Sequence, residues 1–313
     1  MLQRRNPFSG NRKAGHAPTG ACGCRAFPID PRGRSVWRCL AGLKTEILRT
    51  QSIAYSYDDE GRAALRGLSA AFYAGERVAV LGRNGAGKST FFLCCNGVLR
   101  PASGSLLLGG KPVGDKAADR MALRRAVGLV FQDPDSQFIA GSVEADVSFG
   151  PMNLRLPEEE VRRRVERAIR RLGLEDLRRR APHTLSGGEK KRVSIADVLA
   201  MEPSLLLLDE PFASLDPENA LRLEGILDDL SQAGLGLVVA THDVDFAWRW
   251  AQRILVFRDG ELRADADPET VFADHGLLAE CGLEQPILYR VGKRLGLSPL
   301  PRMVEEIPTC ETN

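Results

Sequence analysis

The chain has 313 residues, enough for one large domain or two of moderate size with a substantial hydrophobic core. Its formal net charge is +2 and 27% of its residues are charged, so no global field favours nucleic acid as a partner. No apolar run approaches the roughly 18 residues that a membrane-spanning helix requires. The composition therefore predicts a globular protein that does not itself cross a membrane.

Residues 1–45 differ from the rest of the chain. They contain nine Lys or Arg residues but only one acid, Asp30, together with many Gly and Pro residues. The segment lacks the apolar stretch of a signal peptide, and its Gly and Pro content opposes an amphipathic helix. We expect a disordered extension or a start codon assigned too far upstream, with membrane or nucleic-acid contact as the alternative.

The seven cysteines favour a reduced, cytoplasmic setting. Cys94 and Cys95 are adjacent within an apolar helical pattern, which predicts reduced thiols in a core. Cys22 and Cys24 form a C-x-C without a second pair nearby, whereas zinc sites usually need four ligands at recognisable spacing. Neither pair therefore predicts a metal site.

From residue 46 onward the pattern becomes regular. Alternating or continuous apolar runs predict strands, and a helix is expected to begin on a glycine-rich loop and to cover 89–99. The predicted strands cover 46–57, 76–82, 103–110, 126–132, 204–210, 235–243 and 253–260. Because helical segments separate the later strands, the fold class is α/β, with a mainly parallel sheet covered on both faces.

The segment 156–183 predicts a long amphipathic helix. Its apolar face carries Val161, Val165, Ala168, Ile169 and Leu172. Glutamates precede arginines by four residues in the pairs Glu158–Arg162, Glu159–Arg163, Glu160–Arg164 and Glu166–Arg170. Since acids alternate with the arginines, a solvated face with many ion pairs is favoured over a nucleic-acid surface.

Residues 82–90 read GRNGAGKST and match the phosphate-loop pattern G-x-x-x-x-G-K-S between a predicted strand and a predicted helix. The glycines let successive N–H groups converge on phosphate oxygens, and the helix adds its positive end. Lys88 would neutralise the β- and γ-phosphates, and the Ser89 hydroxyl suits Mg²⁺. The residues expected to contact a nucleoside triphosphate are Gly82, Arg83, Asn84, Gly85, Ala86, Gly87, Lys88, Ser89 and Thr90.

Two further motifs carry chemistry. Asp209 ends a strand that is otherwise apolar and would reach Mg²⁺, whereas Glu210 would be the general base for water that attacks the γ-phosphate. The alternative is a pair of solvated acids. Residues 186–188 read SGG at the start of a helix and predict a second anion site, which could bind the γ-phosphate held by another subunit. Alone, these residues could equally be a good helix start.

These motifs resemble, in order and spacing, those of ATP-binding-cassette (ABC) ATPases over about residues 46–270. The motifs are the phosphate loop at 82–89, a glutamine at 132, LSGGE at 185, LLLLDE at 205, SLDP at 214 and THD at 241. The resemblance implies a P-loop NTPase of ABC type, with a RecA-like core, an antiparallel β subdomain and an inserted α-helical subdomain at about 140–200. The ATPase domain would cover 46–268, followed by a short helical extension and tail at 269–313.

The resemblance also assigns residue roles. Tyr57 would stack on adenine, although Tyr55 competes for that role and Tyr57 could be a core aromatic. Gln132 would sense Mg²⁺ and water and couple the site to a membrane partner. Asp216 would lie in a loop that crosses a dimer interface, and His242 would contact the γ-phosphate. The implied anion contacts of the other subunit are Ser186, Gly187 and Gly188.

Several segments look like the energy-coupling-factor ATPases of cobalt and nickel uptake, a group whose relatives also serve vitamins. They include 128–151, 95–104, 185–211 and 250–257. Phe212 and Asp197 depart from that group, which usually has threonine and glycine there. The resemblance implies a subunit at the cytoplasmic face of the membrane that uses ATP and Mg²⁺.

The implied partners are a second ABC ATPase, identical or different, a transmembrane coupling subunit and a substrate-binding membrane subunit, with no nucleic acid. One alternative is a soluble cassette protein that acts on DNA or ribosomes, but such proteins typically carry two cassettes or a long insert between Lys88 and Ser186. Another is use of the fold as a binding module, which intact Lys88, Asp209 and Glu210 oppose.

Overall fold

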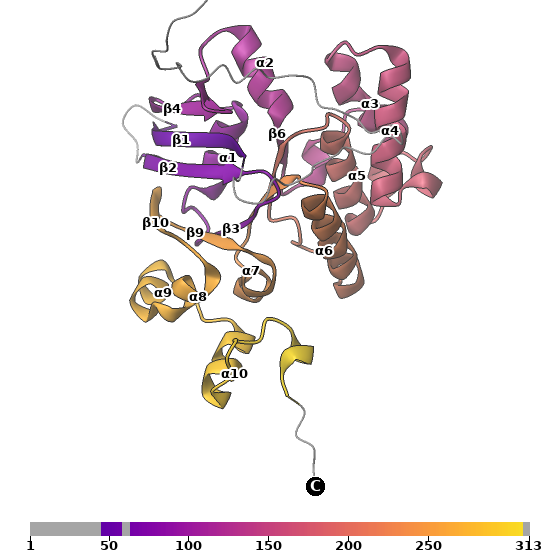
Figure 1. The fold of residues 1–313 in the computed structure, drawn as a ribbon. Coiled ribbons are helices and arrows are strands. Elements are labelled where there is room, and N and C mark those ends of the chain that lie inside the picture. Colours follow the sequence, from indigo (N-terminus) through magenta and orange to yellow (C-terminus); the bar gives the residue numbers. More distant parts are fainter. Residues whose placement is uncertain (1–44, 58–62, 309–313) are drawn as a thin grey trace, which may run out of the picture. The chain divides into compact units, whose positions relative to one another are not determined.

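The computed structural model describes residues 45–57 and 63–308, drawn as coloured ribbon in Figure 1. The extension predicted for residues 1–45 lies outside this range except for Thr45, as do Cys22 and Cys24. The described residues form one four-stranded and one six-stranded sheet with surrounding helices. Among them, no helix combines the length and apolar character needed to span a bilayer.

The six-stranded sheet is mainly parallel, as predicted. Its strand order is β10-β9-β3-β8-β7-β6, and only β10 runs antiparallel to its neighbour. The central strands are short and buried because both faces of the sheet are covered. The strands are β3 (Arg77–Leu81), β6 (Val127–Val130), β7 (Leu205–Asp209), β8 (Gly236–Ala240), β9 (Arg253–Arg258) and β10 (Glu261–Ala266).

The four-stranded sheet is antiparallel, in the order β2-β1-β4-β5. Helix α1 (Lys88–Asn96) connects it to the larger sheet through Phe91. The Phe91 ring lies 6.2 Å from that of Phe72 on β2 and 5.2 Å from that of Phe257 on β9. The strands are β1 (Glu46–Tyr55), β2 (Leu65–Tyr73), β4 (Ser103–Leu108) and β5 (Lys111–Pro112).

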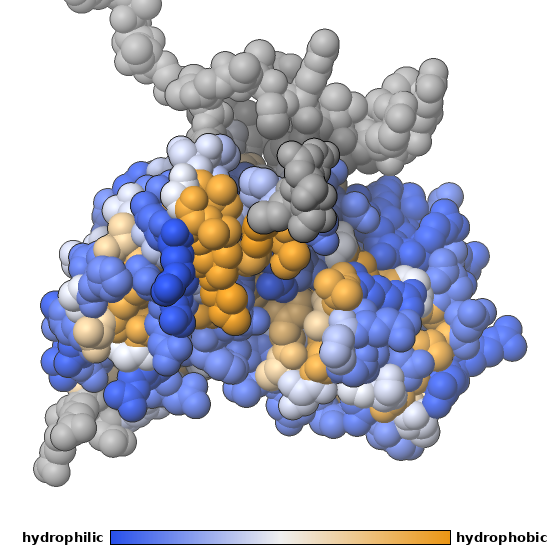
Figure 2. Space-filling view, turned by 90° about the horizontal axis from the view of Figure 1, so that it is seen from below, coloured by the Kyte–Doolittle hydropathy of each residue, from blue (hydrophilic) through white to orange (hydrophobic). Residues whose placement is uncertain are grey.

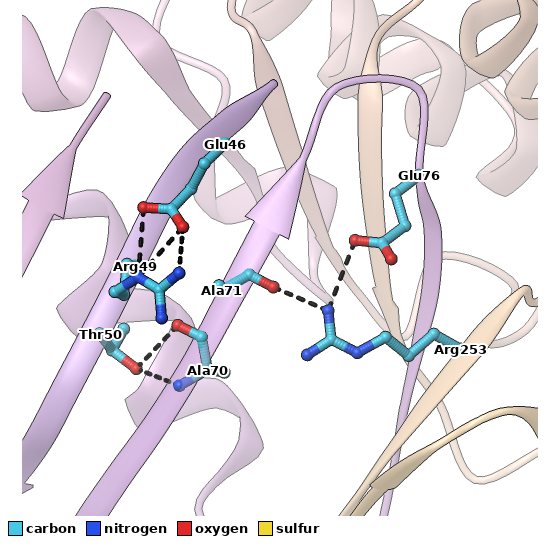
Figure 3. Close-up of polar contacts among 7 residues, drawn as sticks. All are labelled: Glu46, Arg49, Thr50, Ala70, Ala71, Glu76 and Arg253. Carbon is cyan, nitrogen blue, oxygen red and sulfur yellow. Dashed lines mark hydrogen bonds and ion pairs between the residues drawn. The ribbon is translucent and has the colours of Figure 1, made fainter. Parts of the chain in front are cut away.

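Polar contacts also join the two sheets (Figure 3). Arg253, the first residue of β9, donates from Nη1 to the Ala71 carbonyl on β2 at 2.8 Å and lies 3.5 Å from Glu76 Oε2. Within the antiparallel sheet, the buried Thr50 hydroxyl accepts from the Ala70 amide at 2.9 Å, and Arg49 pairs with Glu46. Arg253 thus joins the start of β9 to β2, whereas the contacts of Thr50 and Arg49 stabilise the antiparallel sheet itself.

Successive residues of the central strands point to opposite faces, so the sheet separates two hydrophobic cores. Val78 and Val80 pack with α1 and the antiparallel sheet, whereas Ala79 and Leu81 pack on the opposite face. That second face is covered by α6 (Pro217–Gln232) and α7 (Val244–Trp250), while α2 (Ala117–Ala126) packs beside β6. The expected coverage of both faces is confirmed.

Three helices lie side by side in Figure 1 and pack on one another: α3 (Val143–Asn153), α4 (Glu158–Leu172) and α5 (Gly187–Leu199). The prediction of one helix over 156–183 is wrong at its end. Helix α4 ends at Leu172 because Gly173 adopts φ 60°, a left-handed conformation that terminates helices. Short 3₁₀ turns at Glu175–Leu177 and Pro182–Thr184 follow.

The charge pattern of α4 is largely as predicted. Glutamate–arginine pairs join Glu158 to Arg162, Glu160 to Arg164 and Glu166 to Arg170. The expected Glu159–Arg163 pair is wrong: Arg163 contacts Glu160 at 2.6 Å instead. Glu160 is less exposed than Glu159 and accepts from two arginines at once, which lowers its pKa to about 2.

The prediction of reduced core thiols is confirmed for the described cysteines. Cys94 and Cys95 on α1 and Cys281 near the C-terminus are buried and free. Burial raises the pKa of Cys94 to about 12, so that thiol stays protonated and unreactive at neutral pH.

The chain continues past the larger sheet through α8 (Pro268–Ala273), α9 (His275–Cys281) and α10 (Ile287–Leu295). The segment after α10 returns to α7, where Trp248 Nε1 donates to the Pro301 carbonyl at 2.8 Å and the Arg302 guanidinium covers the Trp248 ring. Ile287 and Leu295 remain exposed. Figure 2 shows the molecule from the side on which α10 lies, where patches of hydrophobic residues are bordered by hydrophilic ones.

Candidate nucleotide-binding site

The phosphate loop connects β3 to α1 and depends on glycine at both of its ends. A Cβ at Gly82 would lie 2.4 Å from the Phe257 carbonyl oxygen, and one at Gly87 would lie 2.7 Å from that of Ala64. Gly87 also adopts φ 102°. It precedes α1 without a side-chain cap, and the first turn of α1 carries no acid. The amides and dipole of α1 therefore face the loop without a competing anion of the helix itself.

Lys88 lies across this loop and is buried. Its ammonium donates to the Gly82 carbonyl at 2.6 Å and lies 3.4 Å from that of Arg83. Burial lowers the pKa of Lys88, while Glu210 and Asp209 oppose that shift. A cation is thus held at the loop by two carbonyls and two nearby carboxylates.

Asp209 and Ser89 are brought together because only β8 separates β7 from β3. Asp209 ends β7 with little exposure, and its carboxylate faces the Ser89 side chain closely enough for that hydroxyl to lower its pKa. Burial raises the pKa of Asp209, whereas Ser89, Lys88 and Lys191 oppose the rise. A carboxylate beside a hydroxyl is a pair of hard oxygen donors, so these two residues fit Mg²⁺.

Glu210 and His242 meet at the same end of the sheet. His242 Nδ1 lies 3.1 Å from each carboxylate oxygen of Glu210. The Glu210 side chain is 10% exposed and that of His242 is 73% exposed. Glu210 has φ 43°, and its amide donates to the Ala240 carbonyl at 2.9 Å, which fixes the strained turn after β7. The pair presents one sheltered carboxylate and one accessible imidazole.

Tyr57 lies beside the start of α1. Its hydroxyl is 3.2 Å from Thr90 Oγ1, and its ring meets that of Tyr55 edge to face at 5.0 Å. Tyr57 is 61% exposed, whereas Tyr55 packs against the core. Of the two candidate aromatics, Tyr57 is therefore the more exposed one beside the start of α1.

The SGG motif begins α5 with a reciprocal capping box. Ser186 Oγ accepts from the Glu189 amide at 3.4 Å, and the Ser186 amide donates to Glu189 Oε2 at 2.8 Å. Ser186 and Gly187 are exposed, but Gly188 is buried. Asp216 caps α6 in a similar way by accepting from the Asn219 amide at 2.9 Å. Both predicted interface motifs are therefore ordinary helix starts that also face outward.

The family pattern named ABC transporter matches residues 65–213. The chain is 45% identical over 240 residues to the energy-coupling factor transporter ATP-binding protein EcfA of Methanothermobacter thermautotrophicus, covering 77% of either chain. It is 42% identical over 245 residues to EcfA2 of Clostridium perfringens, covering 78% of this chain and 86% of the relative. The chain belongs to the energy-coupling-factor ABC ATPases.

Solved structures of ABC ATPases are also similar to this chain. One is described as cbiO1 from Clostridium perfringens, part of the ABC transporter complex cbiONQ; it is 40% identical, with a TM-score of 0.68, over 81% of this chain and 100% of that one. Another is a dimeric ATP-binding cassette in a post-hydrolysis state bound to ADP and Pi, 27% identical with a TM-score of 0.63 over 71% and 99%. The predicted fold and the predicted ATPase activity are confirmed.

Gln132 follows β6 and is exposed, and a residue that the sequence reasoning missed holds it in place. The buried ammonium of Lys191 on α5 donates to the Gln132 carbonyl at 2.7 Å and lies 3.2 Å from that of Phe131. Burial lowers the pKa of Lys191 to about 8, opposed by Asp133 and Asp209. Lys191 is the second lysine of EKKR, where a lysine on the buried face of a helix was the available signal.

Asn219 is a second residue that was missed. Its Nδ2 donates to Asp216 Oδ2 at 2.7 Å, and a Cβ at Gly188 would lie only 2.5 Å from its Cγ. Gly188 is therefore glycine partly because Asn219 approaches the start of α5. The available signal was an asparagine three residues after an N-cap aspartate, although its contact with α5 is tertiary and leaves no local pattern.

Proposed function

We propose that this energy-coupling-factor ATPase powers uptake of cobalt or nickel ions. The proposal is carried by the segments 128–151 and 185–211, which look like the ATPases of that metal-uptake group. It is supported by 40% identity to cbiO1, part of the ABC transporter complex cbiONQ. A vitamin importer is the alternative, because related ATPases serve vitamins and the selective subunit is a different chain.

In the proposed nucleotide site, the amides of 82–90 and the Lys88 ammonium bind the ATP phosphates, and Tyr57 stacks on adenine. Ser89 and Asp209 would hold Mg²⁺, with Gln132 as a further oxygen donor. The bound ion would neutralise charge that develops on the transferred phosphoryl group. The proximity of the Ser89 hydroxyl to the Asp209 carboxylate supports this assignment because it brings two oxygen ligands to one end of the sheet.

Glu210 is the proposed general base. Its carboxylate would accept a proton from the water that attacks the γ-phosphate. His242 touches both oxygens of that carboxylate, so it would orient the base while its exposed ring reaches the γ-phosphate. Shelter of Glu210 from solvent supports a catalytic use, since hydrogen bonds at a dry carboxylate are stronger than in water.

The complete site is proposed to form between two ATPase subunits. Ser186, Gly187 and Gly188 of one subunit would bind the γ-phosphate held by Lys88 of the other, and Asp216 would lie at the same interface. The exposure of Ser186 and Gly187 supports this arrangement. A related cassette bound to ADP and Pi is dimeric. The second subunit is either a copy of this chain or a different ATPase.

The membrane partner is proposed to dock beside Gln132. Three large apolar side chains are exposed further along the chain: Ile139 and, on α3, Phe149 and Met152. Asp146 on α3 fixes this region by accepting from the Ile139 and Ala140 amides at 2.9 and 3.0 Å. A transmembrane coupling subunit that covers these side chains would hold the ATPase at the cytoplasmic face of the membrane, and a substrate-binding membrane subunit would select the ion.

Copurification and uptake test this proposal together. Membrane subunits recovered with the tagged chain are identified, and cells are assayed for uptake of cobalt, nickel and vitamins. We expect metal uptake that Glu210→Gln abolishes. Substituting Asp for both Ile139 and Met152 should lose the membrane partners, whereas Met121→Asp, at an exposed position on α2, should retain them. Vitamin uptake without metal uptake would reject the metal assignment.

A further inference from the structure

The C-terminal helix α9 touches the phosphate loop directly. Gly282 ends α9 with φ 63°, and a Cβ there would lie 2.9 Å from Arg83 Cδ and 3.5 Å from Cγ and Nε. The aliphatic part of the Arg83 side chain, on the second residue of the loop, therefore occupies the space that a side chain at position 282 would need. A larger residue at 282 would push the Arg83 stem, and with it the start of the loop.

A second route leads from α9 to the same loop. Glu280 accepts from Arg258 at 3.0 Å and from Arg263 at 2.7 Å, and so ties α9 to the β9–β10 hairpin. The turn of that hairpin contacts the phosphate loop, because the Gly260 amide donates to the Ala86 carbonyl at 3.1 Å. The loop thus meets the C-terminal extension directly at Arg83, and at Ala86 it meets the hairpin to which Glu280 of the extension is bound.

The helix itself is well anchored. Leu278 and Cys281 point into the hydrophobic core on the face of the sheet that carries α6 and α7. Because one side of α9 is fixed in this core, Gly282 is held in place beside Arg83, and a side chain added at 282 would have to displace the Arg83 side chain rather than the helix.

We propose that the C-terminal extension positions the phosphate loop, with Gly282 and Glu280 as positioning residues that set nucleotide affinity. Neither would contact the nucleotide. Because Gly282 has no side chain, Arg83 can keep its observed position. Glu280 holds the hairpin whose turn donates a hydrogen bond to Ala86. This inference rests on the proposed nucleotide site, which the Lys88→Ala variant tests separately.

The decisive variant is Gly282→Asn in the full chain. Asparagine tolerates the left-handed backbone, so the main effect is the clash with Arg83. Gly296→Asn is a matched control, since Gly296 ends α10 with φ 67° and has nothing within 4 Å of a Cβ. We expect Gly282→Asn to raise the Kd for a non-hydrolysable ATP analogue and the KM for ATP about tenfold. At saturating ATP, kcat should change less than twofold, and the control should change neither.

Two further variants separate positioning from loss of fold. In an Arg83→Ala background, Gly282→Asn should have no additional effect on Kd, because the clashing stem is gone. Glu280→Gln should raise Kd about threefold without lowering kcat. Equal effects at Gly282 and Gly296, fully additive effects of Gly282→Asn and Arg83→Ala, or an unchanged Kd in Glu280→Gln would each overturn the proposal.

Discussion

Helices α1 and α5 both begin with glycine-rich motifs that are proposed to bind phosphate, yet they begin differently. Helix α1 follows Gly87 with no side-chain cap and no acid in its first turn. Helix α5 begins with a capping box in which Ser186 and Glu189 satisfy each other. The first helix start leaves its amides for a ligand, whereas the second is already stable without one.

The difference suggests that the two motifs bind phosphate under different conditions. An uncapped helix start gains most from an anion, so the α1 loop should bind nucleotide within a single subunit. At α5, an anion competes with the Glu189 carboxylate, so binding there should require the additional contacts of a closed dimer. The following variants test whether α1 binds nucleotide within one subunit and α5 only in a dimer.

Lys88→Ala should remove most nucleotide affinity by itself. The variant loses the buried ammonium that is expected to contact both the β- and γ-phosphates, and two charge-assisted hydrogen bonds of about 1.5–3 kcal/mol each correspond to a rise in the Kd for ATP of at least about 100-fold. Calorimetric titration measures this change, and circular dichroism checks that the fold persists. An unchanged affinity would show that the α1 loop is not the ATP site.

Glu210→Gln should separate binding from hydrolysis. The amide keeps the shape of the side chain but cannot accept the proton, so we expect kcat to fall about 10²–10⁴-fold while ATP still binds. Trapped ATP should then hold two subunits together. Light scattering after size exclusion should detect a dimer with ATP and Mg²⁺, but a monomer with ADP. A monomer at saturating ATP would instead favour a different second ATPase or a need for the membrane subunits.

Ser186→Arg, combined with Glu210→Gln, should abolish the ATP-dependent dimer by filling the anion site of α5. Affinity of the monomer for ATP should stay within about twofold, because α1 is untouched. Ser142→Arg is the matched control, since Ser142 caps α3 by accepting from the Ala145 amide at 3.3 Å. Both changes lose an N-cap that contributes about 1 kcal/mol. If both block the dimer equally, the effect comes from the lost cap and not from the site.

Glu189→Gln should produce the smallest effect and a pH signature. The Ser186 amide holds the pKa of Glu189 below its usual value. The carboxylate therefore stabilises the fold above its unfolded pKa of about 4.3, and this contribution disappears as pH falls through the lower folded pKa. At pH 7 we expect the variant to melt about 1–3 °C lower. The difference should shrink as pH falls below about 4.3 and vanish once the pH lies below the lowered folded pKa, whereas Glu159→Gln, at an exposed position, should show no such trend.

The parallel core could be predicted from the sequence because its strands are short, continuously apolar and separated by helices. The phosphate loop could be predicted because its function depends on residues adjacent in the chain. The end of α4 at Gly173 was predictable, since a glycine after the last apolar residue of a helical pattern is a usable stop signal. The pairing of Arg163 with Glu160 could not be predicted, since side-chain burial rather than spacing decides between two nearby glutamates.

Lys191 and Asn219 each carried a local sequence signal, but their tertiary partners could not be predicted. Each joins segments that are far apart in the chain, Gln132 to α5 and α6 to α5, and tertiary contacts of this kind leave no periodic signal. The contact of Gly282 with Arg83 has the same character. Sequence motifs therefore identified the residues expected to meet the nucleotide, but not the residues that hold those motifs in place.

The approach of Asn219 to Gly188 has a mechanical consequence. The first turn of α6 and the first turn of α5 are in van der Waals contact, so neither can shift by an ångström without carrying the other along. If Ser186 and Asp216 lie at the proposed dimer interface, a movement of either helix start when the dimer closes would displace the other helix start as well.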